Sequence, residues 1–383
     1  MSCIELSAVD RLVSVIVPAF NAERTLGETL RSVAHQSHKC LEILIVDDGS
    51  TDATAAIATA FCMNDPRARL ISKPNGGVAS ARNRGIAEAR AEFVAPIDAD
   101  DVWHPDFITR LLEKAIEAPV APGFVHALSR HLDGNSRVVR SCSTTTAGGF
   151  VLGRMIYQNI VGNGSAMLIL RSAALAAGGY DERLRAAGLE GCEDYLLQLQ
   201  IAARHRVAAV SEYLVGYRLG DTTMSSNQER MYHSFQMAIA LFRVDNPDIS
   251  FPTRILRWQR ASGVLVLARW QANRGRFVGA LASLLVASWL DPLATAAALQ
   301  RDATRLKRRV ASRARGTPAA FQSFYALNPA IVGEVGAAPS DWLSLIEAAR
   351  VRWIDRIGLI ADSGVRHSMV GATAVGASAD THS

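Results

Sequence analysis

The chain has 383 residues, of which 49% are hydrophobic and 20% charged, a composition that predicts one large or two moderate globular domains with a full core. Its net charge is a modest +5, and its five cysteines are scattered without a Cys-x-x-Cys pair, which predicts neither a disulfide framework nor a zinc site. The first residues, Met-Ser-Cys-Ile-Glu, lack a basic segment followed by an apolar one, so we expect no signal peptide and a cytoplasmic protein with reduced thiols.

Strand and helix patterns alternate along the first hundred residues. Short apolar strands are predicted at 12–17, 43–46, 69–71 and 93–97, and amphipathic helices between them at 23–37, 53–61 and 78–89. Ser50 or Thr51 is expected to cap the second helix. Repeated strand–helix units predict an α/β fold with an open, mainly parallel twisted sheet and helices on both faces.

The pattern loosens between Phe124 and Ser172, where the clearest strand is 166–170, and a helix is predicted to begin near Glu193. Beyond Gln228 the chain is predicted to be mainly helical. The apolar stretch 277–290 is shorter than the roughly 18–20 residues of a membrane-spanning helix, so we expect a buried helix, with a membrane-surface helix as the alternative.

The predicted units are a catalytic domain, a helical region and a tail. They span 1–228 (nucleotide-binding part about 12–120, acceptor part about 121–228), 229–370 and 371–383, the last expected to be disordered. A basic run from Arg305 to Arg315 is expected to be a solvated helix face, with contact to anionic lipid or nucleic acid as the alternative.

Polar and acidic segments follow three of the predicted strands. They are Pro18–Asn21, Asp47–Ser50 and Asp98–Asp101. In open α/β sheets ligands bind outside the carboxyl ends of the strands, so these segments are expected to meet in one crevice. Carboxylates crowded there repel one another unless a divalent cation is present, and oxygen ligands favour Mg²⁺ or Mn²⁺. The alternative is a polar loop with capping aspartates.

Phosphate binding is expected to depend on the metal and on basic side chains. Gly76 and Gly77 precede a helix but fit neither G-x-G-x-x-G nor the P-loop, which disfavours a Rossmann dehydrogenase and a P-loop ATPase. Arg82, on the following helix, is a candidate diphosphate contact, with a surface arginine as the alternative.

A second acidic pair, Glu193-Asp194, opens a predicted helix. Acids in a first turn are favoured by the helix dipole, so simple stabilisation of the helix is one interpretation. The other is a general base, which needs a carboxylate in the cleft that is free of the metal.

Taken in order, these segments resemble the inverting glycosyltransferases of family 2, which have the GT-A fold. The resemblance covers Val13 to about Ser225, a little over half the chain. Its segments are Val13–Asn21, Glu42–Asp52, Asn75–Gly85, Asp98–Trp103, Gly178–Glu182, Glu193-Asp194, Tyr217-Arg218 and Met224-Ser225.

The resemblance implies a role for each matching residue. Asp48 would accept a hydrogen bond from the donor's base beside Pro18 and Ala19, with Asn21 also among the donor-binding residues. Asp98 would contact the ribose side, Asp100 the metal that bridges the diphosphate, and Asp194 would be the catalytic base. Arg82 and Arg218 would approach the diphosphate or the loop that closes over it. The family often has His three residues after the Tyr of its Tyr-Arg motif, where this chain has Gly220, and this puts a diphosphate or metal contact there in doubt.

The resemblance predicts metal-assisted transfer of a sugar from a nucleoside-diphosphate sugar, a UDP-sugar first, to a hydroxyl of a carbohydrate or lipid-linked acceptor. Polysaccharide or glycoconjugate synthesis is the expected setting, without a nucleic-acid partner but with possible peripheral contact to the inner face of the membrane. The alternatives are a nucleotidyltransferase that makes sugar nucleotides, disfavoured because Pro18–Asn21 is not a Gly-rich basic loop, and a non-catalytic nucleotide-sugar-binding protein, which would have no use for Asp194.

Overall fold

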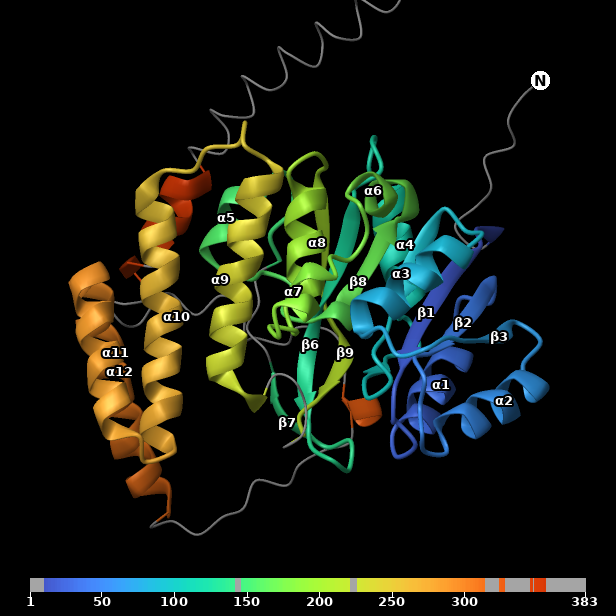
Figure 1. Cartoon of the computed structure of the whole chain (residues 1–383), viewed down its shortest axis with the longest axis horizontal. Helices are drawn as coiled ribbons and strands as arrows, with labels where there is room; N and C mark the ends of the chain where they lie inside the picture. Colours follow the sequence, from blue (N-terminus) through green and yellow to red (C-terminus); the bar gives the residue numbers. More distant parts are fainter. Residues whose placement is uncertain are drawn as a thin grey trace, which may run out of the picture.

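The computed structural model describes residues 10–141, 146–220, 226–313, 324–327, 345–346 and 348–355, with side chains left out at 304–313 and 326. The predicted tail 371–383, the loop residues 221–225 and the side chains of the basic run therefore lie outside the described part. In Figure 1 the sheet occupies one side of the molecule and the last helices the other.

The described strands form one mixed sheet in the order β3-β2-β1-β4-β8-β6-β9-β5, with β7 paired to β6. Their bounds are β1 Val13–Ala19, β2 Leu41–Asp47, β3 Ala68–Ser72, β4 Phe93–Pro96, β5 Val102–Trp103, β6 Phe124–Leu132, β7 Val138–Ser141, β8 Met167–Leu170 and β9 Val207–Arg218. The helices of this region are α1 Leu26–Ala34, α2 Thr54–Asn64, α3 Val78–Glu88, α4 Phe107–Ile116, α5 Leu152–Tyr157, α6 Arg171–Ala176, α7 Arg183–Ala186 and α8 Glu193–Ala202.

The first four strands are parallel, as the sequence predicts. Strands β1 and β2 are buried at every position, which explains their continuous apolar runs. The chain moves outward from β1 to β3 and then returns to β4 beside β1. Right-handed crossovers therefore place α1 and α2 on one face and α3 on the other, and the strand order reverses between β1 and β4.

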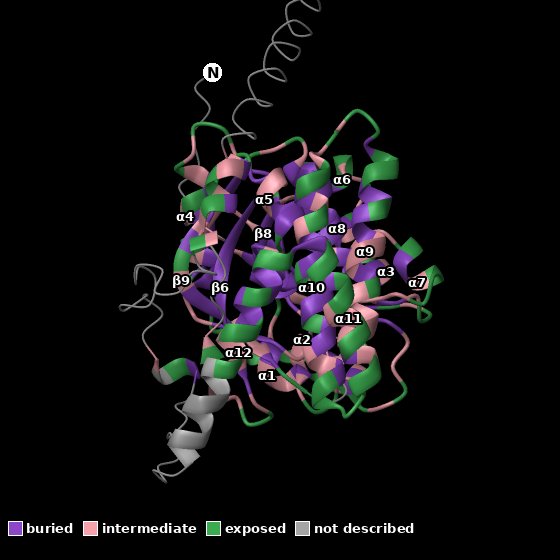
Figure 2. Ribbon diagram, turned by 90° about the vertical axis from the view of Figure 1, so that its left-hand side faces the viewer, coloured by how far each residue is buried: buried purple, intermediate pink, exposed green. Residues whose placement is uncertain are grey.

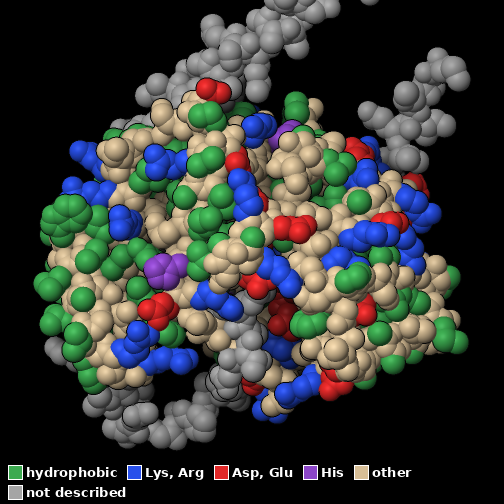
Figure 3. Space-filling view, in the orientation of Figure 1, with side chains coloured by type: hydrophobic (Ala, Val, Ile, Leu, Met, Phe, Trp, Pro, Cys, Tyr) green, Lys and Arg blue, Asp and Glu red, His purple; other side chains and the backbone are tan. Residues whose placement is uncertain are grey.

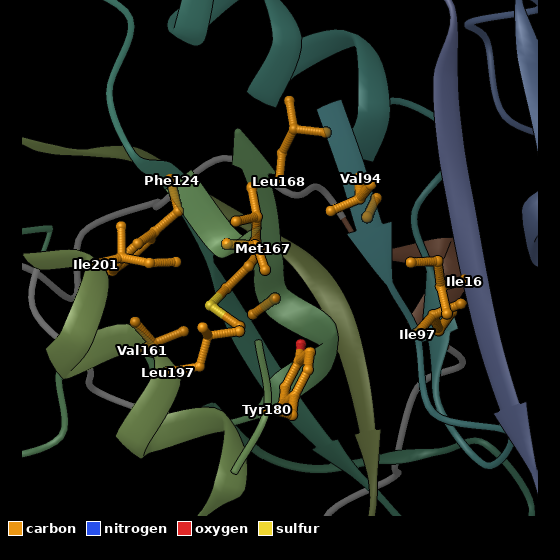
Figure 4. Close-up of a cluster of buried hydrophobic side chains, with 14 of the residues drawn as sticks. Ile16, Val94, Ile97, Phe124, Val161, Met167, Leu168, Tyr180, Leu197 and Ile201 are labelled. Atoms are coloured by element: carbon orange, nitrogen blue, oxygen red, sulfur yellow. The ribbon is translucent and has the colours of Figure 1, made fainter. Parts of the chain in front are cut away.

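The second half of the sheet is mixed rather than parallel. Strand β8 runs antiparallel to both β4 and β6, whereas β6 and β9 are parallel to each other. Figure 4 shows the apolar side chains that join this half to the first: Ile16 and Val94 lie on one side of Met167 and Leu168, with Leu197 and Ile201 of α8 on the other.

One local prediction about the second helix is wrong. Helix α2 begins at Thr54, and the carboxylate of Asp52, rather than Ser50 or Thr51, accepts the Thr54 backbone N–H at 2.9 Å. Ser50 is instead used across the loop, where its hydroxyl accepts the Asn21 N–H at 3.1 Å.

The helices after the sheet are α9 Gln228–Asp245, α10 Thr253–Asn273, α11 Phe277–Leu290 and α12 Pro292–Arg313, followed by a 3₁₀ turn at Phe324–Ala326. Ala238, Phe242 and Ile255 belong to the same buried core as the sheet, so α9 and the start of α10 pack on the region that contains the sheet. The expectation that 277–290 is a buried helix is wrong, because α11 buries only Ala280, Ala287 and Leu290 and exposes most of its large apolar side chains. Figure 2 shows this exposed helix beside α10 and α12.

Candidate active site

A cavity of about 900 Å³ opens at the carboxyl ends of β1 and β4. Other parts of its wall come from α3, the segment 157–164, α8, the end of β9, α9 and α10. The sequence-predicted residues that line it are Pro18, Asn21, Arg82, Asp98, Asp100, Asp194 and Arg218. The other two sequence-predicted residues, Ala19 and Asp48, do not line the cavity.

Asp48 is buried, and its carboxylate is occupied by the following loop. It accepts hydrogen bonds from Lys73 Nζ at 2.5 Å, the Gly76 N–H at 2.9 Å and the Gly77 N–H at 2.7 Å. Gly77 has a φ of 88°, in the region that favours glycine, and its N–H can reach Asp48 because of this turn. The contacts of Asp48 in this structure therefore fix the loop 73–77 against β2.

Asn21 connects the loops that follow β1 and β2 at the rim of the cavity. Its side-chain oxygen accepts the Thr51 N–H at 2.9 Å, while its backbone N–H donates to Ser50 Oγ. Asn21 has a φ of 47°, which asparagine tolerates better than most residues. Together with Pro18, which pairs with Val46 in the β1–β2 register, it shapes the rim after β1.

Arg82 is buried between the two acidic clusters. It forms an ion pair with Asp98, its guanidinium lies 5.1 Å from the centroid of the Tyr180 ring, and it is close enough to Asp194 to influence its pKa. Asn83 holds Tyr180 in place, since its amide accepts the Tyr180 N–H at 2.7 Å and donates to the Tyr180 carbonyl at 2.8 Å. The Arg82 Nε is buried without a hydrogen-bond partner in the described part of the chain.

The acids after β4 differ in their surroundings. Asp101 is fully buried, accepting Ser165 Oγ–H at 2.6 Å and the Arg218 N–H at 3.0 Å, and burial raises its pKa. Asp100 lines the cavity, and no hydrogen bond from another described residue reaches its carboxylate. Burial, with a smaller effect of Asp98, raises the pKa of Asp100 to about 6.

Arg218 lines the cavity but its guanidinium is engaged by the protein. It donates to Glu28 Oε2 at 2.7 Å, to the Asp100 carbonyl at 2.8 Å and to Ser136 Oγ at 3.1 Å. These contacts fix the end of β9 against the loop that carries Asp100. Gly220, at the position where the family often has His, also lines the cavity.

Asp194 and Glu193 lie in the first turn of α8 and both border the cavity, but their carboxylates have different hydrogen-bond partners. Asp194 lines the cavity, and one of its oxygens accepts the Tyr195 N–H at 2.7 Å. Burial raises the pKa of Asp194, outweighing the opposing effect of Arg82. Glu193 is 2% exposed and both of its oxygens accept the Gly191 N–H at 3.0 Å, so its carboxylate is bound to the preceding loop.

The donor set at Asp100 fits a hard divalent cation. The described residues contain no group of three or more His, Cys, Asp or Glu side chains arranged to hold a metal alone. Mg²⁺ and Mn²⁺ commonly use one or two carboxylates, with substrate phosphates and water as the other ligands. A carboxylate without other partners on the cavity wall, as at Asp100, is suited to that kind of site.

Two features of the site were not found from the sequence. Gly164, in the 3₁₀ turn Gly164–Ala166, lies against the acidic clusters: a Cβ added there would be 2.8 Å from Arg82 Nη2 and 3.5 Å from Asp194 Cβ. The second is the wall made by α9 and α10, lined by Met231, Tyr232, Phe235, Gln259, Ser262, Gly263 and Val266. A lone Gly-Ser and ordinary amphipathic helices give no sequence signal for either role.

Comparison with solved structures identifies the fold as that of GT-A glycosyltransferases. The mannosyltransferase PcManGT from Pyrobaculum calidifontis, in complex with GDP-Man and Mn²⁺, superposes with a TM-score of 0.53 at 20% identity, over 76% of this chain and 79% of that one. S. aureus TarS in complex with UDP-GlcNAc gives a TM-score of 0.51 at 19% identity, over 81% of this chain and 93% of that one.

Residues 14–176 match glycosyl transferase family 2, the family that the sequence resembles. An uncharacterized glycosyltransferase of Rickettsia felis is 29% identical over 241 residues, which are 63% of this chain and 38% of that protein. The chain thus spans well under two thirds of this curated relative's length. None of the helices in the described residues is both long enough and apolar enough to span a membrane.

Proposed function

We propose that this protein transfers a sugar from a nucleoside-diphosphate sugar to an acceptor hydroxyl, with inversion and with the help of Mg²⁺ or Mn²⁺. The observation that carries the proposal is the presence of Arg82, Asp98, Asp100 and Asp194 on the wall of one cavity at the point where the strand order reverses. UDP-sugars are the first candidates, and GDP-Man is the second, because structural neighbours bind UDP-GlcNAc and GDP-Man.

On the donor side, Pro18 and Asn21 would bound the nucleotide, Asp98 would face its ribose and Asp100 would hold the cation. The cation, when bound, supplies positive charge that stabilises the leaving nucleoside diphosphate.

Arg82 adds a fixed positive charge next to Asp98, and its Nε has no hydrogen-bond partner in the described part of the chain. Arg218 would act by holding the Asp100 loop, since its guanidinium is already engaged by Glu28 and Ser136. Ala19 and Asp48 would support the base pocket from behind the cavity wall.

On the acceptor side, Asp194 is proposed to take the proton of the attacking hydroxyl. One of its oxygens accepts the Tyr195 N–H, which orients the carboxylate and leaves the second oxygen for the acceptor. Its pKa is raised, so it is a stronger base than an exposed aspartate. An acceptor aligned behind the anomeric carbon gives inversion, because the leaving group departs from the opposite face.

We also propose that residues 1–228 form the catalytic unit, with the donor part at about 12–120 and the acceptor part at about 121–228. The helical region 229–370 would complete the acceptor site, because α9 and α10 contribute apolar, aromatic and amide side chains to the same cavity. Tyr232 and Phe235 offer flat apolar surfaces for a sugar ring or a lipid-linked acceptor, and Gln259 offers hydrogen bonds.

The proposal is tested by measuring nucleoside diphosphate released from a panel of UDP- and GDP-sugars with Mn²⁺ or Mg²⁺. Release with one donor, stimulated by a carbohydrate or lipid-linked acceptor and abolished by chelator, is expected. Thermal stabilisation by nucleoside diphosphates without any release would indicate a binding protein. Full activity in excess chelator would exclude the metal-assisted form of the proposal.

A further inference from the structure

Helix α11 exposes an apolar surface on the side of the molecule away from the sheet. Its members are Phe277, Val278, Leu281, Leu285 and Trp289, which are 71%, 87%, 60%, 65% and 76% exposed. Their helical spacing puts them along one side of α11, here called the α11 face, while the buried Ala287 packs with residues of α10 and α12. Figure 3 shows hydrophobic side chains gathered at the left edge, where Figure 1 places α11. An exposed patch of this kind marks an interaction surface.

Both ends of the α11 face carry arginine beside tryptophan. Before the helix, Arg274 and Arg276 lie 5.0 and 5.7 Å from the Trp270 ring centroid. At the C-terminal end of α11, Arg257 of α10 lies 5.6 Å from the centroid of the Trp289 ring and donates a hydrogen bond to the Trp289 carbonyl at 2.7 Å. Arginine and tryptophan each combine an apolar body with a polar end, which suits the boundary between lipid and water.

Negative charge is absent from the α11 face and is paired at its borders. No residue of Phe277–Leu290 is charged. Asp291, the next residue, is 5% exposed and pairs with Arg350 at 2.7 Å. Glu229, near the start of α9, pairs with Arg276 at 2.7 Å. An apolar surface with arginines at both ends is complementary to a partner that is apolar inside and negative at its rim.

This charge pattern disfavours a second copy of the chain as the occupant. If two α11 faces packed in parallel, Arg274 would meet Arg274, and if they packed antiparallel, Arg274 would meet Arg257. Either arrangement brings like charges together at both ends of the contact, which opposes association. An anionic lipid surface has no such conflict, because its head groups attract the same arginines that a second copy would repel.

We propose that the α11 face rests on an anionic membrane surface, with the helix lying along the lipid rather than crossing it. Fourteen residues of helix extend about 21 Å, less than the roughly 30 Å of a bilayer's hydrocarbon core. Helix α10 packs on α11 and also lines the cavity through Gln259, Ser262 and Val266. Docking would hold the acceptor side of the cavity next to the lipid, a consequence that rests on the proposed function, whereas docking itself does not.

The test is sedimentation of the full chain with vesicles of two-thirds phosphatidylcholine and one-third phosphatidylglycerol at low salt. We expect the wild-type chain to pellet with these vesicles and to bind much more weakly to phosphatidylcholine alone. The double variant Val278→Glu/Leu285→Glu should lower vesicle partitioning by about tenfold or more, because two carboxylates would face anionic lipid. The matched control, Met63→Glu/Val120→Glu, adds the same two charges at apolar residues that are 83% and 72% exposed elsewhere on the protein.

The outcomes distinguish docking from the alternatives. Wild-type protein that stays in the supernatant with anionic vesicles overturns the proposal, whatever the variants do. Equal losses in both double variants also overturn it, because net charge alone would then explain binding. Self-association in analytical ultracentrifugation that the α11 variant removes, with vesicle binding unchanged, would show that the face holds a second copy. Vesicle binding without detectable sugar transfer would support docking while contradicting the proposed function.

Discussion

Replacing Asp194 by Asn separates a general base from a residue that only stabilises its helix. Asn keeps the size of the side chain and an oxygen that can accept the Tyr195 N–H, but it cannot take a proton at neutral pH. Positioned general bases contribute about 10²–10⁴-fold, so transfer should fall by that factor, equivalent to about 3–5 kcal/mol of barrier. Donor affinity should change by less than about threefold, since the proposed role is on the acceptor side.

The structure also predicts the stability of this variant. The pKa of Asp194 is raised, which means that its ionised form is disfavoured in the folded state relative to the unfolded one. Removing the charge at neutral pH should therefore leave the free energy of unfolding equal or higher. A residue that only stabilised the start of α8 would behave in the opposite way, with a loss of up to about 1 kcal/mol and nearly unchanged turnover.

Calorimetry of donor binding, nucleotide release and urea denaturation measure the three quantities on the same preparations. Glu193→Gln is the control, because it removes a charge from the same helical turn and the same cavity wall, at a carboxylate whose two oxygens are both bound to the Gly191 N–H. Equal and mild effects of both variants on turnover would refute the assignment of Asp194. So would a loss of stability in Asp194→Asn with turnover per folded molecule intact.

Three further predictions follow from other parts of the structure. Asp100→Asn should weaken donor binding measured by calorimetry with Mn²⁺. Asp48→Asn loses part of a buried hydrogen-bond set, so it should mainly lower the free energy of unfolding measured in urea, by about 1–3 kcal/mol. The reverse pattern would contradict both roles. Gly164→Ala would place a methyl group 2.8 Å from Arg82 Nη2, so turnover should fall while the melting temperature changes little; wild-type turnover would show that the Arg82 position is not critical. Burial lowers the pKa of His126 from 6.5 to about 4, so stability should be lost as pH falls between those values, by on the order of 3 kcal/mol, and denaturation of His126→Gln should show a flatter pH dependence.

The parallel part of the sheet could be predicted from the sequence because its strands are buried on both faces. Val13–Ala19 and Leu41–Asp47 are almost entirely apolar and each is followed by a polar turn, so pattern and structure agree. Strand β6 was not found because it contains buried polar residues. Ser129 accepts a hydrogen bond from Asn163 at 2.7 Å and Arg130 lies 4.8 Å from the Tyr213 ring centroid, partners that are distant in the sequence.

The surroundings of α11 and of the site residues also depend on partners that are distant in the sequence, so the sequence alone could not predict them. An apolar stretch of 14 residues indicates a helix, but whether its faces are buried depends on how many neighbours pack around it. Among the described residues, α10 and α12 pack on one side of α11, and the other side is exposed. At the site, the sequence predicted that Asp98 and Asp100 follow a strand, that Asp194 lies in the first turn of a helix and that Arg82 lies on the helix after Gly77, but it predicted no strand ending at Arg218. It could not distinguish the arginine that is occupied by Glu28 from the one that lies beside Asp98 and Asp194.

The carboxylates after β2 and β4 differ in whether their oxygens are already bound by other residues of the protein, and this difference bears on which of them can bind a ligand. Asp48 and Asp101 are buried, and their carboxylate oxygens already accept hydrogen bonds from protein donors, so they are poorly placed to bind a cation. Asp100 is in the opposite situation, because it is held in place through its backbone by Arg218 while its carboxylate lines the cavity without a partner from another described residue. Burial raises the pKa of Asp100, as it raises that of Asp101, so the two carboxyls differ in their hydrogen-bond partners rather than in the direction of their pKa shifts. If the Asp100 loop served stability alone, a hydrogen-bond donor paired with its carboxylate would stabilise the loop further. We therefore infer that this carboxylate is left available for a ligand.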